Sequence, residues 1–184
     1  GPPLRLGLGG LGELLEVKLR QPMEPTEIAA AVNASLPEGI RLRGGHAVGD
    51  QAPKLSKLAM FADSLVLIPT EEVDRIEADA WSAVTGGAEV LFERTDKKGR
   101  TKTVDLSVGI DTVAWRTALP SDSEEWITVE PDERILELRL ALQGPEMVRP
   151  EEVLSVLFGG RIPPQAQVIR RRLLPAMRSA STSA

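Results

Sequence analysis

The feature that most constrains the fold is a leucine-rich stretch at residues 133–142. Successive side chains of a strand point to opposite faces, so the even and odd positions of the stretch form two separate rows. The even row carries leucine at 136, 138, 140 and 142, whereas the odd row mixes Glu and Arg with Ile and Ala. A helix would spread these leucines around its whole circumference. The stretch therefore predicts a long interior strand with one face on a core and the other partly in contact with water.

Two strand–helix–strand units are predicted around this strand. The first spans 57–93 and the second spans 133–174, and the helical part of each has apolar residues at helical spacing. Their βαββαβ order is the ferredoxin-like split βαβ pattern, in which the first strand of each half is central. We therefore predict an α+β fold in which 133–142 lies beside the strand at 57–68.

Two further segments complete the predicted architecture. Residues 94–129 form a β-hairpin insertion between the two halves, because Asp96–Gly99 has the sequence of a hairpin turn. Residues 13–48 are predicted as an additional strand–helix–strand, with strands at 13–20 and 40–43. This extra βαβ half-unit has no partner half in the chain. Either it packs as an extra layer or edge, or its partner half lies upstream and is absent, and we expect the second arrangement.

The predicted domain boundaries follow from these units. Residues 1–50 contain the half-unit, and residues 57–176 form the ferredoxin-like domain with its hairpin insertion. The small, polar residues 177–184 are expected to form a disordered tail. A chain of 184 residues can bury a real core in either one large domain or two small ones.

Composition excludes several kinds of chemistry. The chain has no cysteine, which rules out disulfides, thiolate catalysis and cysteine-ligated zinc or iron–sulfur clusters. Its single histidine, His46, cannot supply a His-rich metal site. No apolar run approaches the length of a membrane span. We therefore expect no metal, no cofactor and no membrane partner, and a location in the cytoplasm or an equivalent reducing organelle compartment.

The overall charge also limits the possible partners. The formal net charge is −5, so no global field attracts nucleic acid or an anionic membrane. Three Trp, three Phe and no Tyr do not suggest a stacking platform for single-stranded nucleic acid. Any contact with a polyanion must therefore be made by a local patch.

Two basic clusters could form such a patch. Contact with phosphates by a projecting hairpin is predicted for the first cluster, and the last strand supplies the second. The candidate nucleic-acid-binding residues are Arg94, Lys97, Lys98, Arg100, Lys102, Arg170 and Arg172. In a regular strand Arg171 faces away from its two neighbours, so that triplet forms one patch only where a strand ends. The alternative for the hairpin is a charged turn that prevents edge-to-edge aggregation.

The order of several motifs resembles a known family. The chain has a loop containing Pro, Leu and Gly, a strand, an acidic-Pro helix start, a Leu-Pro-x-Gly turn, a basic hairpin and a late Arg-Pro-Glu-Glu helix start. These motifs are found at Gly1–Gly7, Glu13–Leu19, Glu24–Ile28, Leu36–Ile40, Lys97–Leu106 and Val148–Val153. Together they resemble the radical-SAM-linked domain of unknown function.

This resemblance implies an accessory domain rather than the radical enzyme itself. Members of that family occur fused behind, or encoded beside, cobalamin-type radical SAM proteins. The cluster-binding CxxxCxxC motif is absent here, as the lack of cysteine requires. The chain also has no counterpart of the family's basic N-terminal segment, which agrees with the expected missing half. The family has no settled activity, so the resemblance supplies no catalytic residue.

Three hypotheses about function follow. The first is a non-catalytic accessory domain of a radical SAM enzyme, in the same chain or a neighbouring protein, that binds or presents an RNA substrate. The second is a protein-docking or structural domain with no nucleic-acid role. The third is an autonomous enzyme, which requires a pocket with converging titratable groups that the sequence does not reveal.

Overall fold

The computed structural model describes residues 7–49, 51–55, 58 and 60–175 of the chain. The chain divides into two compact units, which are described separately below. The larger unit combines Gly1–Leu14 with Leu58–Ala184, and the smaller one is Leu15–Lys57. The tail predicted to be disordered lies outside the described residues.

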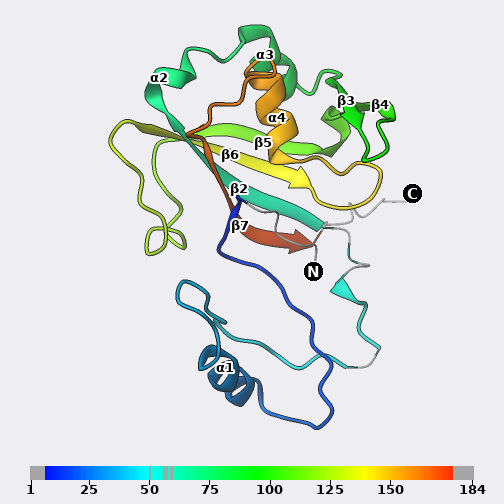
Figure 1. The fold of residues 1–184 in the computed structure, drawn as a ribbon, viewed down its shortest axis with the longest axis vertical. Helices are drawn as coiled ribbons and strands as arrows, with labels where there is room; N and C mark the ends of the chain where they lie inside the picture. Colours follow the sequence, from blue (N-terminus) through cyan, green and yellow to red (C-terminus); the bar gives the residue numbers. More distant parts are fainter. Residues whose placement is uncertain (1–6, 50, 56–57, 59, 176–184) are drawn as a thin grey trace, which may run out of the picture. The chain divides into compact units, whose positions relative to one another are not determined.

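The larger unit is built on a five-stranded sheet, seen at the centre of Figure 1. Its strand order is β1-β7-β2-β6-β5, in which β2 is antiparallel to both of its neighbours and β6 is antiparallel to β5. The strands are β1 (Gly9–Gly10), β2 (Met60–Pro69), β5 (Ile110–Arg116), β6 (Glu133–Ala141) and β7 (Gln167–Pro175). The leucine-rich stretch is therefore an interior strand beside β2, as its alternation predicts, and the α+β class is confirmed.

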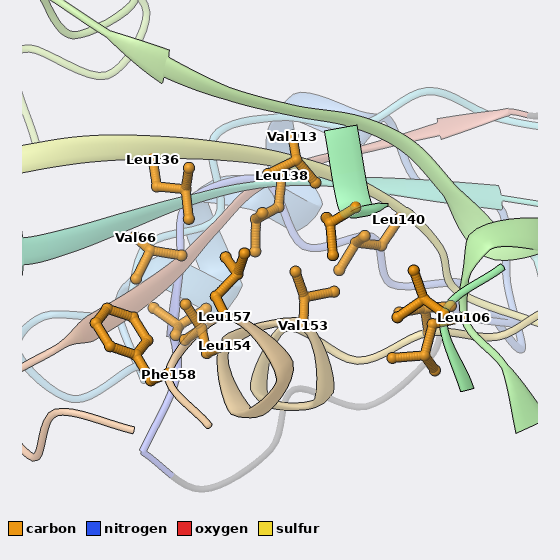
Figure 2. Packing of buried hydrophobic residues seen from close by; sticks show 14 of the residues in the cluster. Val66, Leu106, Val113, Leu136, Leu138, Leu140, Val153, Leu154, Leu157 and Phe158 are labelled. Atoms are coloured by element: carbon orange, nitrogen blue, oxygen red, sulfur yellow. The ribbon is translucent and has the colours of Figure 1, made fainter. Parts of the chain in front are cut away.

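One face of this sheet is covered by helices. The helices of the unit are α2 (Thr70–Val73), α3 (Ala78–Gly86) and α4 (Pro150–Leu157). Figure 2 shows Val153, Leu154 and Leu157 of α4 packed against the leucines of β6. Leu138 and Leu157 are completely buried, and burial of one such side chain stabilises a fold by about 1.5–3 kcal/mol. The even row of β6 therefore forms the core face.

A pair of tryptophans joins α3 to the edge of the sheet. The rings of Trp81 in α3 and Trp115 in β5 are stacked, with centroids 5.6 Å apart and planes inclined by 17°. The guanidinium of Arg134 lies over Trp115, 5.9 Å from the ring centroid. These two rings are engaged with each other and with the core, so they serve as packing anchors.

The opposite face of the sheet has a smaller apolar cluster and several charged side chains. Leu65 and Leu67 of β2 pack there with Ile135 of β6 and with Ile127 from the loop between β5 and β6. The odd positions of β2 and β6 share this face because Asp63, Leu65 and Leu67 are paired with 139, 137 and 135 in register. Asp63 continues the same row and is 1% exposed.

The predicted hairpin insertion forms. Its first strand, however, includes residues 91–93, which end the predicted 57–93 unit. Strands β3 (Leu91–Thr95) and β4 (Thr101–Asp105) pair only with each other, in a separate two-stranded sheet. The strand that lies beside β6 is β5, and not the strand that ends the predicted 57–93 unit. The tight turn at 96–99 pairs β3 with its immediate neighbour in the chain, whereas β5 carries Val113 and Trp115 toward the core. The detailed ferredoxin-like assignment is therefore wrong at this strand.

The smaller unit contains the expected helix but lacks the expected strands. Helix α1 (Pro25–Asn33) begins with proline in its first turn, and the stretches at 13–20 and 40–43 form no strand. A strand needs a neighbour to pair its backbone groups, and the alternating pattern alone does not supply one. At Leu42 the side chain of Asn33 bonds the backbone in place of a neighbouring strand. It donates a hydrogen bond to the Leu42 carbonyl at 2.9 Å and accepts one from the Leu42 amide at 2.7 Å. The predicted βαβ half-unit is therefore wrong in its strands.

Candidate functional site

The tip of the hairpin β3–β4 is organised by Asp96. Its Oδ1 accepts hydrogen bonds from the amides of Lys98 and Arg100 at 2.8 and 3.0 Å. Gly99 closes the turn with φ 78°, a conformation that glycine adopts without strain. The amide of Arg100, then its guanidinium, hold the pKa of Asp96 below its usual range. The predicted turn is confirmed, and it presents Lys97 and Lys98 at its end.

Arg94, in the second ladder pair from the turn, fastens this hairpin to helix α4. Its Nε and Nη2 donate to the two carboxylate oxygens of Glu152, each at 2.7 Å, and Nη2 also donates to the carbonyl of Met147. Glu152 is 5% exposed, so this is a two-pronged ion pair in a largely dry setting. Of the predicted contact residues, Arg94 is therefore one that positions the hairpin.

The lysines of the hairpin are in a different situation. Lys97, Lys98 and Lys102 are exposed, and their side chains make no hydrogen bond or ion pair within residues 7–49, 51–55, 58 and 60–175. Arg100 pairs with Asp96 at 2.7 Å while remaining 76% exposed. The structure thus brings five of the predicted residues onto one element and leaves three of their charges available to a partner.

The two predicted residues in the last strand lie on another element, β7. Arg170 is buried, and its Nε donates to Oε1 of Glu13 at 2.6 Å. Arg172 donates from Nε to Oδ2 of Asp63 at 2.8 Å. Whether these two residues contact nucleic acid stays a prediction, but both guanidinium groups are already held by carboxylates of the fold.

A β-bulge changes the expected direction of Arg171. Asp63 pairs with Arg172 and Ser64 pairs with Arg170, so Arg171 is an extra residue in β7. The bulge lets Arg171 and Arg172 approach the same carboxylate, and Nη2 of Arg171 donates to Oδ2 of Asp63 at 2.9 Å. The expected alternation of the triplet therefore fails at this point.

Asp63 is the centre of an ion-pair cluster that the sequence reasoning missed. Besides the two β7 arginines, Arg139 of β6 donates from Nε to its Oδ1 at 2.7 Å. Burial alone would raise the pKa of Asp63, but the hydrogen bonds and charges of Arg139 and Arg172 outweigh it and lower that pKa. The same contact, with a hydrogen bond to Asp63 as its main cause, raises the pKa of Arg139. The one sequence signal for this cluster was Asp63 itself, an acidic residue inside the otherwise largely apolar strand β2.

The cluster extends along the sheet face. Arg171 also lies 3.1 Å from Asp122 and 3.8 Å from Glu137, and Glu137 accepts a bond of 2.8 Å from Arg116. Arg139 has a second, longer contact of 3.5 Å with an exposed aspartate, Asp111. Arginines and carboxylates alternate across β2, β5, β6 and β7, so the positive charges of this cluster are balanced locally.

The described residues contain no cluster of three or more His, Asp or Glu that could hold a metal ion. His46 is exposed and lies in the smaller unit. None of the helices in the described part of the chain combines the length and the apolar character that a membrane crossing requires.

The comparisons with known proteins give one positive result. Residues 1–150 match the profile of the family described as "Uncharacterized protein conserved in bacteria (DUF2344)". The chain belongs to this family. The part that matches DUF2344 includes the hairpin and Asp63 and ends at the first residue of α4, so Glu152 and the β7 arginines follow it. Neither the curated proteins nor the solved structures contain a match to the chain.

Proposed function

We propose that this chain is a non-catalytic accessory domain that binds RNA through the hairpin β3–β4 and presents it to a radical SAM enzyme. The observation that carries the proposal is the set of exposed lysines Lys97, Lys98 and Lys102 on an anchored hairpin, whose side chains have no partner in the described part of the chain. The link to a radical SAM enzyme rests on the resemblance of the sequence motifs. We place the domain in the cytoplasm with that enzyme.

The anchoring of the hairpin supports this proposal. A binding element loses less entropy on association when its backbone is already fixed. The bonds from Arg94 to Glu152, the turn bonds to Asp96 and a five-pair ladder fix the hairpin before any ligand arrives. The lysine side chains remain free to follow a phosphate backbone, which is recognised through charge rather than sequence.

The acidic total charge is compatible with a local basic surface. Surface charges more than about 10 Å apart are largely screened at 0.1 M salt, so the hairpin tip acts on a ligand through its own charges. Most of the arginine charges elsewhere in the larger unit are balanced by carboxylates, as the cluster around Asp63 illustrates. The hairpin therefore groups three exposed lysines whose side chains have no carboxylate partner among the described residues.

An electrophoretic shift with total tRNA or rRNA fragments at low salt tests the proposal. Lys97→Glu with Lys98→Glu should weaken the shift by about tenfold or more, because two phosphate contacts become repulsive. A matched control is Lys18→Glu with Lys54→Glu, which changes the net charge equally at two exposed lysines of the smaller unit. Absence of binding by the wild-type chain, or equal weakening by both pairs, would contradict the proposal.

A second candidate function, docking to a protein, is favoured by the smaller unit. None of its described residues is buried. Its exposed apolar side chains include Leu15, Val17, Leu19, Met23, Val32, Ile40 and Val48. Where such side chains are contiguous, they form the kind of surface that contacts another protein. Capture of the radical SAM enzyme that persists after nuclease treatment, and is lost in Leu15→Ser with Val17→Ser, would support docking without RNA.

A further inference from the structure

The end of the hairpin near its turn borders an open pocket of about 370 Å³. It is lined by four cationic side chains together with Asp96 and two threonines. The cationic residues are Arg94, Arg100, Lys102 and Arg149. Arg149 is the residue before α4, far from the hairpin in sequence, and it is absent from the residues predicted above. The pocket therefore joins the hairpin to the beginning of α4.

Two of these cations stand directly opposite each other. Arg94 and Lys102 are register partners in the antiparallel pair β3–β4. Side chains of such a pair share one face, with Cβ atoms about 5 Å apart, and like charges in this position destabilise a sheet. Phe92 and Val104, the next pair on the same face, pack against the core. The pair Arg94–Lys102 thus follows the apolar pair Phe92–Val104 on the same face of the hairpin and lines the pocket.

The carboxylates near the pocket compensate only part of this charge. Asp96 pairs with Arg100, and Glu152 serves both Arg94 at 2.7 Å and Arg149 at 3.7 Å. Lys102 has no carboxylate partner within the described residues. Among the described residues, four cations line this opening and two carboxylates pair with them, which leaves two positive charges uncompensated. A phosphate group, with up to two negative charges and several acceptor oxygens, matches this deficit.

We propose that this pocket binds one phosphate group, with Lys102 and Arg149 as its direct ligands and Arg94 as a positioning residue. Arg94 is assigned that lesser role because its Nε and one Nη are already used by Glu152. The inference deepens and rests on the proposed function, because RNA brings phosphate groups to the hairpin. The pocket gives the hairpin a defined phosphate site. Lys97 and Lys98, which do not line the pocket, attract an RNA backbone less specifically.

Titration with inorganic phosphate, followed by amide chemical shifts and compared with chloride at equal ionic strength, tests the pocket without RNA. The expected result is a saturable change at 94–102 and 149, with a Kd on the order of 1 mM. Lys102→Ala with Arg149→Ala should raise that Kd about tenfold or more, because both direct ligands are removed. Lys97→Ala with Lys98→Ala is the matched control and should leave it unchanged. Linear shifts equal to those with chloride, or an equal loss in both double variants, would overturn the proposal.

A second arm identifies the source of the phosphate. The same RNA oligonucleotide is compared with a 5′-phosphate and with a 5′-hydroxyl. Tighter binding of the phosphorylated strand that disappears in Lys102→Ala with Arg149→Ala assigns the pocket to a terminal phosphate. Equal binding of both strands, weakened in the same variant, assigns it to a backbone phosphate. If inorganic phosphate binds and RNA does not, the pocket stands and the proposed function fails.

Discussion

The hairpin β3–β4 and the sheet face around Asp63 both contain clusters of basic side chains, but the two clusters differ in how far carboxylates pair with them. On the sheet face, three arginines from two strands converge on one carboxylate that is 1% exposed. On the hairpin, the exposed side chains of Lys97, Lys98 and Lys102 have no hydrogen-bond or ion-pair partner within the described residues. The first arrangement stabilises the fold, and the second is available to a ligand. The structural cluster therefore differs from the available one in the pairing of its basic residues with carboxylates, and not in the number of basic residues.

The largest effect is expected from removing the central carboxylate. Asp63→Asn leaves Arg139, Arg171 and Arg172 repelling one another, with Arg171 only 8% exposed. Loss of one partner from a buried ion pair costs about 3–5 kcal/mol. Urea unfolding should show a loss of that size in the free energy of unfolding, with no direct effect on the hairpin.

A matched control comes from the same cluster. Asp111 lies 3.5 Å from Arg139 but is 47% exposed, and exposed ion pairs contribute about 0–1 kcal/mol. Asp111→Asn should therefore be nearly neutral. Equal losses for the two variants would mean that burial is not what makes the Asp63 cluster structural.

The next largest effect should come from the anchor of the hairpin. Arg94→Met removes two hydrogen bonds from Glu152, which remains buried with the backbone amide of Arg149 at 2.9 Å and a longer contact to the Arg149 guanidinium at 3.7 Å. We expect a loss of about 2–3 kcal/mol in the free energy of unfolding. Arg100→Met, at a 76% exposed position, should change it by less than about 0.5 kcal/mol. If Arg94→Met were as neutral as Arg100→Met, the hairpin would not be anchored through this ion pair.

The pH dependence of stability gives a smaller, graded effect. Because the folded-state pKa of Asp63 is lowered, its contribution is fully present above the unfolded-state pKa of about 3.9. The contribution is lost as pH falls from there through the lower folded-state pKa. The difference in unfolding free energy between wild type and Asp63→Asn should thus be constant from pH 7 to pH 5 and shrink below pH 4. A difference that stays constant down to pH 2 would contradict the assigned charge state.

The sequence predicted the elements with strong local patterns. The leucine alternation placed β6 inside the sheet, and Asp96 with Gly99 identified the hairpin turn. It failed where pairing depends on distant residues. The stretch at 13–20 alternates but forms no strand, and β5 rather than 88–93 pairs with β6.

The candidate site was predictable to a similar degree. The hairpin lysines are contiguous, so their cluster is visible in the sequence. Arg149 joins them only because α4 begins beside the hairpin, and the partners of Asp63 come from strands more than 70 residues away along the chain. The bulge at Arg171 has no local signal, since it reflects a register shift between two strands. Such long-range pairings are set by the packing of the whole sheet.

The most direct test of the central claim is the salt dependence of RNA affinity. Each lysine that contacts a phosphate of a single strand adds about 0.7 to the slope of log affinity against log salt concentration. Replacing Lys97, Lys98 and Lys102 by alanine should therefore make this negative slope shallower by about 2. Replacing Lys18 and Lys54 by alanine should leave the slope unchanged. An unchanged slope in the hairpin variant, or an equal fall in the control, would contradict the claim that the free lysines of β3–β4 bind RNA.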